Sequence, residues 1–185
     1  MTLLVLDLRV PVSTISQPII YEQDLLGALA RLGPNILPYL MSFLTLGIFW
    51  VGQQTQLNNF TRSNRHLTWL NLVFLLAVTL TPFSTGLLAA FITFRLAIVV
   101  YWLNIVLLGV MLFVSWRYAR HAQLLKEDVT KEIFAANQRR IVIAQSLYAF
   151  GALLCIINTY VSIGFIVLVQ LNYAIAPRFG RLDRL

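Results

Sequence analysis

The sequence predicts an all-α, polytopic integral membrane protein with six transmembrane helices, the first of them truncated in this chain. Three observations lead to this fold class. Of the 185 residues 59% are hydrophobic, only 11% are charged, and the mean hydropathy is +0.78. A soluble domain carries charge on about a quarter of its residues. The other two observations are long apolar runs and an uneven distribution of positive charge between the loops.

The first element is the apolar run Met1–Leu6, which Asp7, Arg9 and Pro11 bring to an end. Six residues rise roughly 9 Å as a helix, whereas the hydrocarbon core of a bilayer is about 30 Å thick. We therefore interpret residues 1–10 as the C-terminal half of a span and expect its other half to lie upstream of Met1.

The second element is the first complete span, expected at residues 34–56 and followed by a polar run that ends at His66. The fifty residues of Leu67–Trp116 then contain a single charge, Arg95. That run is too long for one crossing and predicts a hairpin. Turn-forming residues concentrate at Thr81–Gly86, so the break is expected there and in the short segment after it.

This break divides the run into spans at about 66–85 and 96–118. A charge-mixed stretch follows, to be read as a solvated helical loop, and then a second apolar run, Ile141–Ala176. As one helix it would reach roughly 54 Å, so it too should fold back, at Asn158, Thr159 and Tyr160. The last two spans are expected at 139–158 and 160–176, which makes residues 1–185 a single transmembrane domain.

Positive charge orients these spans. Eleven of the fourteen Lys and Arg residues fall in the second and fourth loops or in the C-terminal tail, and only Arg9, Arg31 and Arg95 fall on the other side. Because Lys and Arg are retained on the cytoplasmic side of a bilayer, the C-terminus is predicted to be cytoplasmic. An N-terminus on the same side requires an even number of crossings. The first segment must therefore count as part of a sixth span.

The motif search favours neither an enzyme nor a nucleic-acid-binding protein. The sequence lacks G-x-S-x-G, H-E-x-x-H and a glycine-rich phosphate loop, and its one cysteine, Cys155, lies in an apolar run. The excess of basic residues follows from membrane topology rather than from a nucleic-acid partner. No T-V-G-Y-G potassium filter is present either.

Polar side chains at membrane depth need partners inside the protein. Trp69, Asn71 and Asn104 are candidates for such packing, and two similar stretches contain them, TWLNLVFLLAV and YWLNIVLLGVM. An internal repeat and a chance likeness of apolar sequence both remain open. The asparagines are read either as hydrogen-bonding groups between helices or as ion ligands. The other candidates are Gln145, Asn158, Gln170, Asn172, Trp102 and Arg95.

Several stretches together resemble the transmembrane protein 175 family of lysosomal and prokaryotic potassium channels. They are MTLLVLDLRVP, LPYLMSFLTLGIFWVGQQTQLNNF and RHLTWLNLVFLLAVTLTPFSTGLL, and the likeness extends over nearly the whole chain. The resemblance implies a prokaryotic cell-membrane channel with one six-span unit per chain. It also implies a homotetramer around a central pore, with potassium as the permeant ion and with no cofactor.

The same resemblance implies that bulky apolar side chains of the first helix form the pore constriction. The matching positions are Thr2, Leu3 and Leu6, which share one face of a helix. Rings of leucine would gate by dewetting and force partial dehydration of the ion. Asp7 would lie at the pore mouth, and an ordinary solvated carboxylate is the alternative for it.

One departure accompanies the resemblance, because the family's R-x-x-x-F-S-D motif is absent from this chain. We expect that motif upstream of Met1. Two other functions stay open at this point, a secondary transporter and a membrane scaffold without conduction. A transporter predicts paired helix interruptions, and Pro82 with Gly86 offers a single one.

Overall fold

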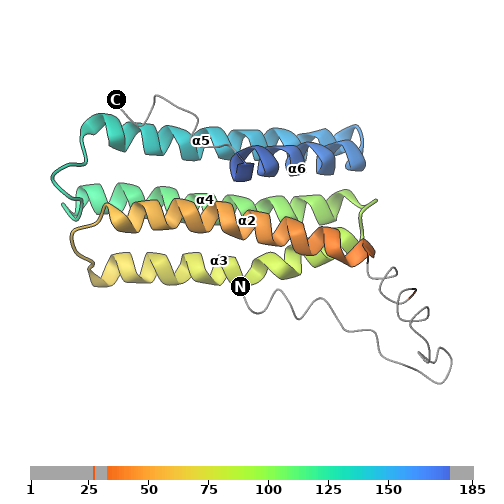
Figure 1. The fold of residues 1–185 in the computed structure, drawn as a ribbon, viewed down its shortest axis with the longest axis horizontal. Helices are drawn as coiled ribbons and strands as arrows, with labels where there is room; N and C mark the ends of the chain where they lie inside the picture. The colour runs from red at the N-terminus through yellow and green to blue at the C-terminus, as the bar shows by residue number, and fades with distance from the viewer. Residues whose placement is uncertain (1–26, 28–32, 176–185) are drawn as a thin grey trace, which may run out of the picture.

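The computed structural model describes Gly27 and residues 33–175 of the chain, and in this part it is helical apart from one isolated β-bridge (Figure 1). The elements are α2 (Gly33–Asn58), α3 (Arg65–Ala90), α4 (Arg95–His121), α5 (Lys131–Leu153), the short 3₁₀ helix η2 (Leu154–Ile156) and α6 (Thr159–Ile175).

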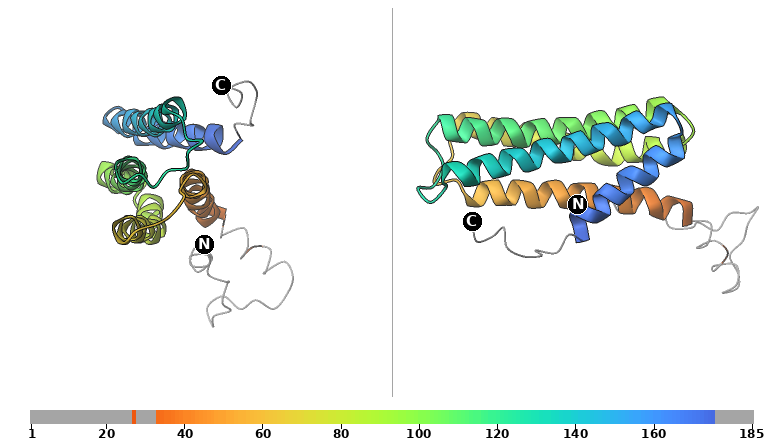
Figure 2. Two further views of the ribbon diagram at one scale, coloured as in Figure 1. Left: turned by 90° about the vertical axis from the view of Figure 1, so that its left-hand side faces the viewer. Right: turned by 90° about the horizontal axis from the view of Figure 1, so that it is seen from above.

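The long helices run side by side as a bundle, with α2, α3 and α4 on one side and α5 and α6 on the other (Figure 1). Seen from above, α6 runs obliquely to its neighbours (Figure 2). Helix α4 lies in the centre and contacts α2, α3, α5 and α6, so it contributes the largest share of buried residues. The core therefore follows α4 from one end of the bundle to the other.

Three helices are long and apolar enough to cross a membrane in the part of the chain that the structure describes: Arg65–Ala90, Arg95–His121 and Lys131–Ile156. Their outward faces carry large apolar side chains, such as Phe83, Leu96 and Leu153, each more than three-fifths exposed. A helix that is apolar all round is typical of a membrane span, because lipid as well as protein contacts it. These features show a helical membrane protein.

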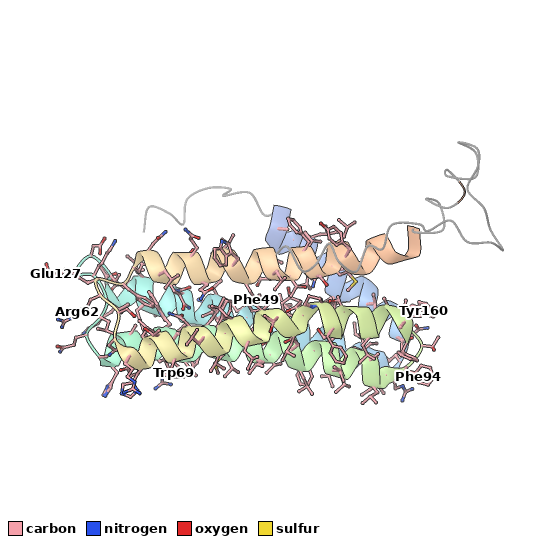
Figure 3. All side chains as sticks on the ribbon, turned by 90° about the horizontal axis from the view of Figure 1, so that it is seen from below. Phe49, Arg62, Trp69, Phe94, Glu127 and Tyr160 are labelled. Atoms are coloured by element: carbon pink, nitrogen blue, oxygen red, sulfur yellow. The ribbon has the colours of Figure 1, made fainter. Side chains whose placement is uncertain are left out.

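The two charged loops meet at one end of the bundle. Phe60 and Leu125 form the isolated antiparallel bridge, with hydrogen bonds from Thr61 N to Leu124 O (2.8 Å) and from Lys126 N to Asn59 O (2.9 Å). Figure 3 shows Arg62 and Glu127 at this end, whereas Phe94 and Tyr160 lie at the opposite end. The structure thus brings the second and fourth loops of the sequence to the same side.

The chain does not turn at Thr81–Gly86, so this part of the sequence prediction is wrong. Helix α3 continues through Pro82 to Ala90, and the chain reverses in the short segment that follows. Hydroxyl groups on this turn bond to helix carbonyls, Thr81 Oγ1 to Ala77 O (3.3 Å) and Ser84 Oγ to Thr81 O (3.0 Å). Such bonds help a membrane helix to tolerate a proline, which lacks the N–H of an ordinary helical residue.

The charge-mixed stretch of residues 117–140 is mostly helical, as its interpretation as a helical loop predicts. Helix α4 extends to His121 and α5 begins at Lys131, which leaves only residues 122–130 between them. Thr130 caps α5 by accepting a hydrogen bond from Ile133 N at 3.3 Å, and Glu132 lies in the first turn. Both features stabilise a helix N-terminus.

Candidate functional site

The predicted pore residues Thr2, Leu3 and Leu6, and Asp7 at the predicted mouth, lie outside the described residues. Within residues 33–175 the polar side chains that lie at membrane depth gather in two places. One is the interior shared by α2, α3, α4 and α6, and the other is a crevice bordered by α2 and α5.

The first interior cluster joins three helices through Thr45 of α2, Tyr101 of α4 and Gln170 of α6. Gln170 Nε2 donates to Thr45 Oγ1 (2.7 Å) and to Tyr101 Oη (2.6 Å), and these two hydroxyls lie 2.9 Å apart. All three side chains are 0% exposed. Inside a protein such hydrogen bonds are stronger than in water, so this cluster fixes how the three helices pack.

The second interior cluster lies between α2, α3 and α4. Ser42 and Thr85 hydrogen-bond to each other through their hydroxyls. The Asn104 amide, 7% exposed, lies 3.0 Å from Thr81 Oγ1 and 3.2 Å from Ser84 Oγ. With its oxygen facing these hydroxyls, its nitrogen donates to Ala77 O at 3.1 Å, which satisfies both ends of the amide. This asparagine therefore holds α4 to the proline-containing turn of α3.

These clusters hold helices together without carrying charge. Every charged side chain among residues 39–174 is exposed. The described residues also contain no group of three or more His, Cys, Asp or Glu side chains suited to a metal ion. The interior clusters consist of hydroxyl and amide groups that hydrogen-bond to one another. They are therefore suited to hold the helices in a rigid arrangement.

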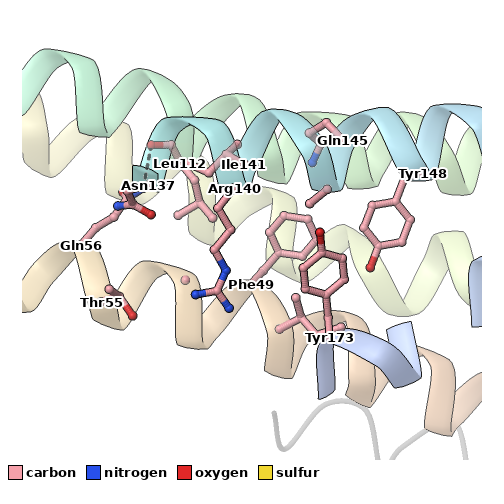
Figure 4. Close-up of a pocket in the computed structure, with 13 residues that line it drawn as sticks. Phe49, Thr55, Gln56, Leu112, Asn137, Arg140, Ile141, Gln145, Tyr148 and Tyr173 are labelled. Atoms are coloured by element: carbon pink, nitrogen blue, oxygen red, sulfur yellow. Dashed lines mark hydrogen bonds between the residues drawn. The ribbon is translucent and has the colours of Figure 1, made fainter. Parts of the chain in front are cut away.

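The crevice is a cavity of about 70 Å³ whose lining includes Thr55, Gln56 and Arg140. Helices α2 and α5 supply most of its wall, and Leu112 of α4 and Tyr173 of α6 complete it (Figure 4). Gln56 Nε2 donates to Leu112 O at 3.0 Å, which closes the crevice on the α2–α4 side. Two buried polar atoms at the crevice, Gln145 Oε1 and the Tyr148 hydroxyl, have no protein partner, and in the first interior cluster the same holds for Gln170 Oε1.

The other residues singled out from the sequence lie apart from both clusters. Trp69 is 59% exposed on α3, and Asn71 is half-buried. Trp102 is half-buried, and its indole nitrogen has no hydrogen-bond partner among the described residues. The two W-L-N stretches are therefore packed differently. Their roles in packing stay predictions.

Sequence reasoning missed the hydroxyl groups of both clusters, from Ser42, Thr45, Ser84, Thr85 and Tyr101. Serine, threonine and tyrosine are common in apolar helices, and nothing in their spacing marks these five. Their partners could have pointed to these hydroxyl groups, because the sequence already marks Gln170 and Asn104 as candidate polar groups at membrane depth. A buried amide predicts nearby hydroxyls, although it does not say on which helix they lie.

Comparisons with known proteins find similar chains among potassium channels. The model of the endosomal/lysosomal potassium channel TMEM175 family matches residues 1–82. A potassium channel of Chamaesiphon minutus is 26% identical over 178 residues, which cover 94% of this chain and 86% of the relative. A potassium channel of Streptomyces collinus is 34% identical over 91 residues, 49% of this chain and 41% of that protein.

The fold agrees with these matches. The crystal structure of a lysosomal potassium-selective channel TMEM175 homologue from Chamaesiphon minutus superposes with a TM-score of 0.75. The match covers 95% of this chain and 88% of the other, at 24% sequence identity. The relatives that match are named as channels, which are not enzymes, in agreement with the absence of enzyme motifs from the sequence. Residues 1–82 thus match the TMEM175 family model, and the described helical bundle has the fold of the solved homologue.

Proposed function

We propose that the chain is a potassium-permeable cation channel that conducts passively through a homotetrameric pore in a prokaryotic cell membrane. The observation that carries this proposal is the likeness to a potassium channel of Chamaesiphon minutus over 94% of the chain. Because that likeness extends beyond residues 1–82 to the whole helical bundle, it concerns the complete unit rather than one motif.

In this proposal residues 1–185 form one transmembrane domain of six spans, the first of them truncated in this chain, and the C-terminus is cytoplasmic. The joined loops support this orientation, because they bring Arg62 and Lys126 to the same end of the bundle. Positive charge collects on the cytoplasmic side of membrane proteins. Helices α2 to α6 then form the wall around the first segments of four copies.

The proposed constriction is formed by Thr2, Leu3 and Leu6 of each subunit, with Asp7 at the mouth. Four copies of each leucine would make apolar rings, which gate by dewetting and strip part of the water from the ion. The four carboxylates of Asp7 would raise the local cation concentration at the mouth. The interior clusters of α2, α3, α4 and α6 support this proposal by holding the surrounding helices rigid.

The test is potassium flux into liposomes that contain the purified protein. We expect flux that rises in proportion to the ion concentration. Leu3→Ala and Leu6→Ala should each widen the constriction, raise the flux and lower the preference for potassium over sodium. Leu96→Ala is the matched control, because Leu96 is 72% exposed on the outer face of α4 and should leave both quantities unchanged.

Two results would contradict the channel itself. Flux that saturates at low ion concentration would indicate a transporter, and absence of flux would indicate a scaffold. If neither leucine variant differs from Leu96→Ala, the channel proposal stands but the constriction lies elsewhere.

A further inference from the structure

The crevice bordered by α2 and α5 has features that the channel proposal does not use. A second, open groove of about 470 Å³ is lined mainly by α5, and Arg140 and Tyr173 border both spaces. Figure 4 shows the Arg140 side chain extending from α5 toward α2. A ligand in either space therefore lies beside Arg140.

Two buried polar atoms at the crevice have no hydrogen-bond partner in the protein. They are the hydroxyl of Tyr148, whose side chain is 1% exposed, and Oε1 of Gln145. Both residues line the cavity. An unpartnered buried polar group costs roughly 1–3 kcal/mol, so nearly all such groups in proteins have partners. Both atoms are therefore suited to contact a polar ligand.

Close packing holds the Gln145 side chain in place. Its Nε2 donates to Ile105 O at 3.2 Å, and the side chain lies directly on Gly109 of α4. A Cβ atom on Gly109 would lie 1.8 Å from that nitrogen, so only glycine leaves room for the amide in this position. Because Nε2 is used, the free Oε1 accepts hydrogen bonds and therefore requires a donor.

The charge of the crevice selects an anion. Arg140 lies nine residues into α5 from Lys131, a rise of roughly 14 Å, where a cation needs a counter-charge or water. Arg139 borders the outer groove beside it. Among the described residues the inner cavity is lined by no carboxylate, and Glu132 lies only at the outer groove.

The walls of the two spaces are apolar, as an acyl chain requires. Phe49, Leu112 and Ile141 line the cavity, and Ile143, which is 45% exposed, lines the groove. The ligand thus has an anionic group, hydroxyl donors and an apolar tail. Arg139 and Arg140 border the groove, and basic residues of membrane proteins lie near the headgroups of the cytoplasmic leaflet.

We propose that this crevice binds the headgroup of an anionic phospholipid of the phosphatidylglycerol class. Arg140 contacts the phosphate, since guanidinium groups bind phosphate through paired, charge-assisted hydrogen bonds. A glycerol hydroxyl donates to Gln145 Oε1, and the Tyr148 hydroxyl donates to an oxygen of the headgroup. The acyl chains lie along Ile143 and the outer face of α5. Basic pockets between membrane helices are suited to such headgroups.

The test compares lipid binding by the full chain in detergent, with native mass spectrometry and thermal unfolding as readouts. Dioleoyl phosphatidylglycerol should bind and raise the Tm, whereas dioleoyl phosphatidylcholine should do neither at the same concentration. Arg140→Gln should weaken binding of phosphatidylglycerol by about tenfold or more, and Tyr148→Phe by a smaller factor. Arg140→Lys, which keeps the charge, should retain part of the affinity.

The matched control is Arg62→Gln, which removes one positive charge from the loop at the same end of the bundle. It should bind phosphatidylglycerol as the unchanged protein does. Equal affinity of Arg140→Gln and Arg62→Gln would overturn the proposal. So would a Tm rise of the same size with inorganic phosphate alone, because the site would then take a free anion. These readouts are independent of conduction, so the lipid site and the channel can fail separately.

Discussion

Two buried tyrosines, Tyr101 and Tyr148, show how differently the two sides of the bundle use polar groups. Both side chains are at most 1% exposed. The Tyr101 hydroxyl lies within 2.9 Å of partners on α2 and α6, whereas the Tyr148 hydroxyl has no partner in the protein. The first hydroxyl is hydrogen-bonded within the cluster that joins α2, α4 and α6. The second borders the crevice and is buried without a protein partner.

The two glutamines differ in what their Nε2 reaches, although the Oε1 of each is buried without a protein partner. Gln170 donates to two hydroxyls at the centre of the interior cluster, and Gln145 uses one end of its amide to reach the α4 backbone. Hydrogen bonds between membrane helices contribute roughly 0.6 kcal/mol on average and up to about 1.7 kcal/mol. Packing contributes the rest, and this is where the largest mutational effect is expected.

The largest effect is expected for Gly109→Ala, which tests whether the crevice side depends on close packing. The new Cβ would lie 1.8 Å from Gln145 Nε2 and 2.3 Å from its Cδ. The amide must move and lose its bond to Ile105 O, so we expect a loss of about 1–3 kcal/mol in the free energy of unfolding. Reversible unfolding in mixed micelles measures this quantity.

Gln145→Ala provides the matched background for this substitution, because it removes the side chain that the methyl group meets. In that background Gly109→Ala should lower the free energy of unfolding by less than it does in the unchanged protein. Gly47→Ala serves as the second control, since a Cβ at Gly47 has no atom within 4 Å. Equal costs for Gly109→Ala in both backgrounds would show that Gln145 does not fill this space.

A smaller effect is expected for Tyr101→Phe, which opens the interior cluster. The change removes one acceptor of Gln170 Nε2 and one partner of the Thr45 hydroxyl. The hydrogen bond between Gln170 and Thr45 remains. We expect a loss of about 0.6–1.7 kcal/mol in the free energy of unfolding. The same unfolding experiment measures it, and no loss at all would mean that the cluster does not couple α4 to α6.

The smallest loss is expected for Tyr148→Phe in lipid-free detergent. Its hydroxyl forms no hydrogen bond within the protein, so its removal should not lower the free energy of unfolding, and it takes away the cost of a buried group without a partner. The comparison with Tyr101→Phe is direct, because both changes delete one hydroxyl from a buried ring. A loss as large as that of Tyr101→Phe would break the contrast between the two sides.

Much of the fold follows from the sequence, because apolar length and loop charge decide where a membrane helix begins and ends. The turn before α6 lies close to Asn158, which accepts a hydrogen bond from Tyr160 N at 2.8 Å. Proline was misleading at Thr81–Gly86. In water Pro82 marks a break, whereas in this helix neighbouring hydroxyls and Asn104 hold the turn together.

The candidate sites were less accessible to sequence reasoning. The pattern of a helix that is apolar on every side does not reveal which face meets protein and which meets lipid. Gln145 and Gln170 were candidates on equal terms, yet one borders a crevice and the other is enclosed. Only the rotation of each helix about its axis decides this, and side-chain packing across helices sets that rotation. Arg140 lay at the edge of a charged stretch and gave no signal.

The bridge between Phe60 and Leu125 has a mechanical consequence. Two backbone hydrogen bonds, from Thr61 to Leu124 and from Lys126 to Asn59, tie the loop after α2 to the loop after α4. One end of each of the helices α2, α3, α4 and α5 is thereby tied together at the same end of the bundle. Helix α5, which carries Arg140, and α2, which lines the crevice with it, therefore share one anchor.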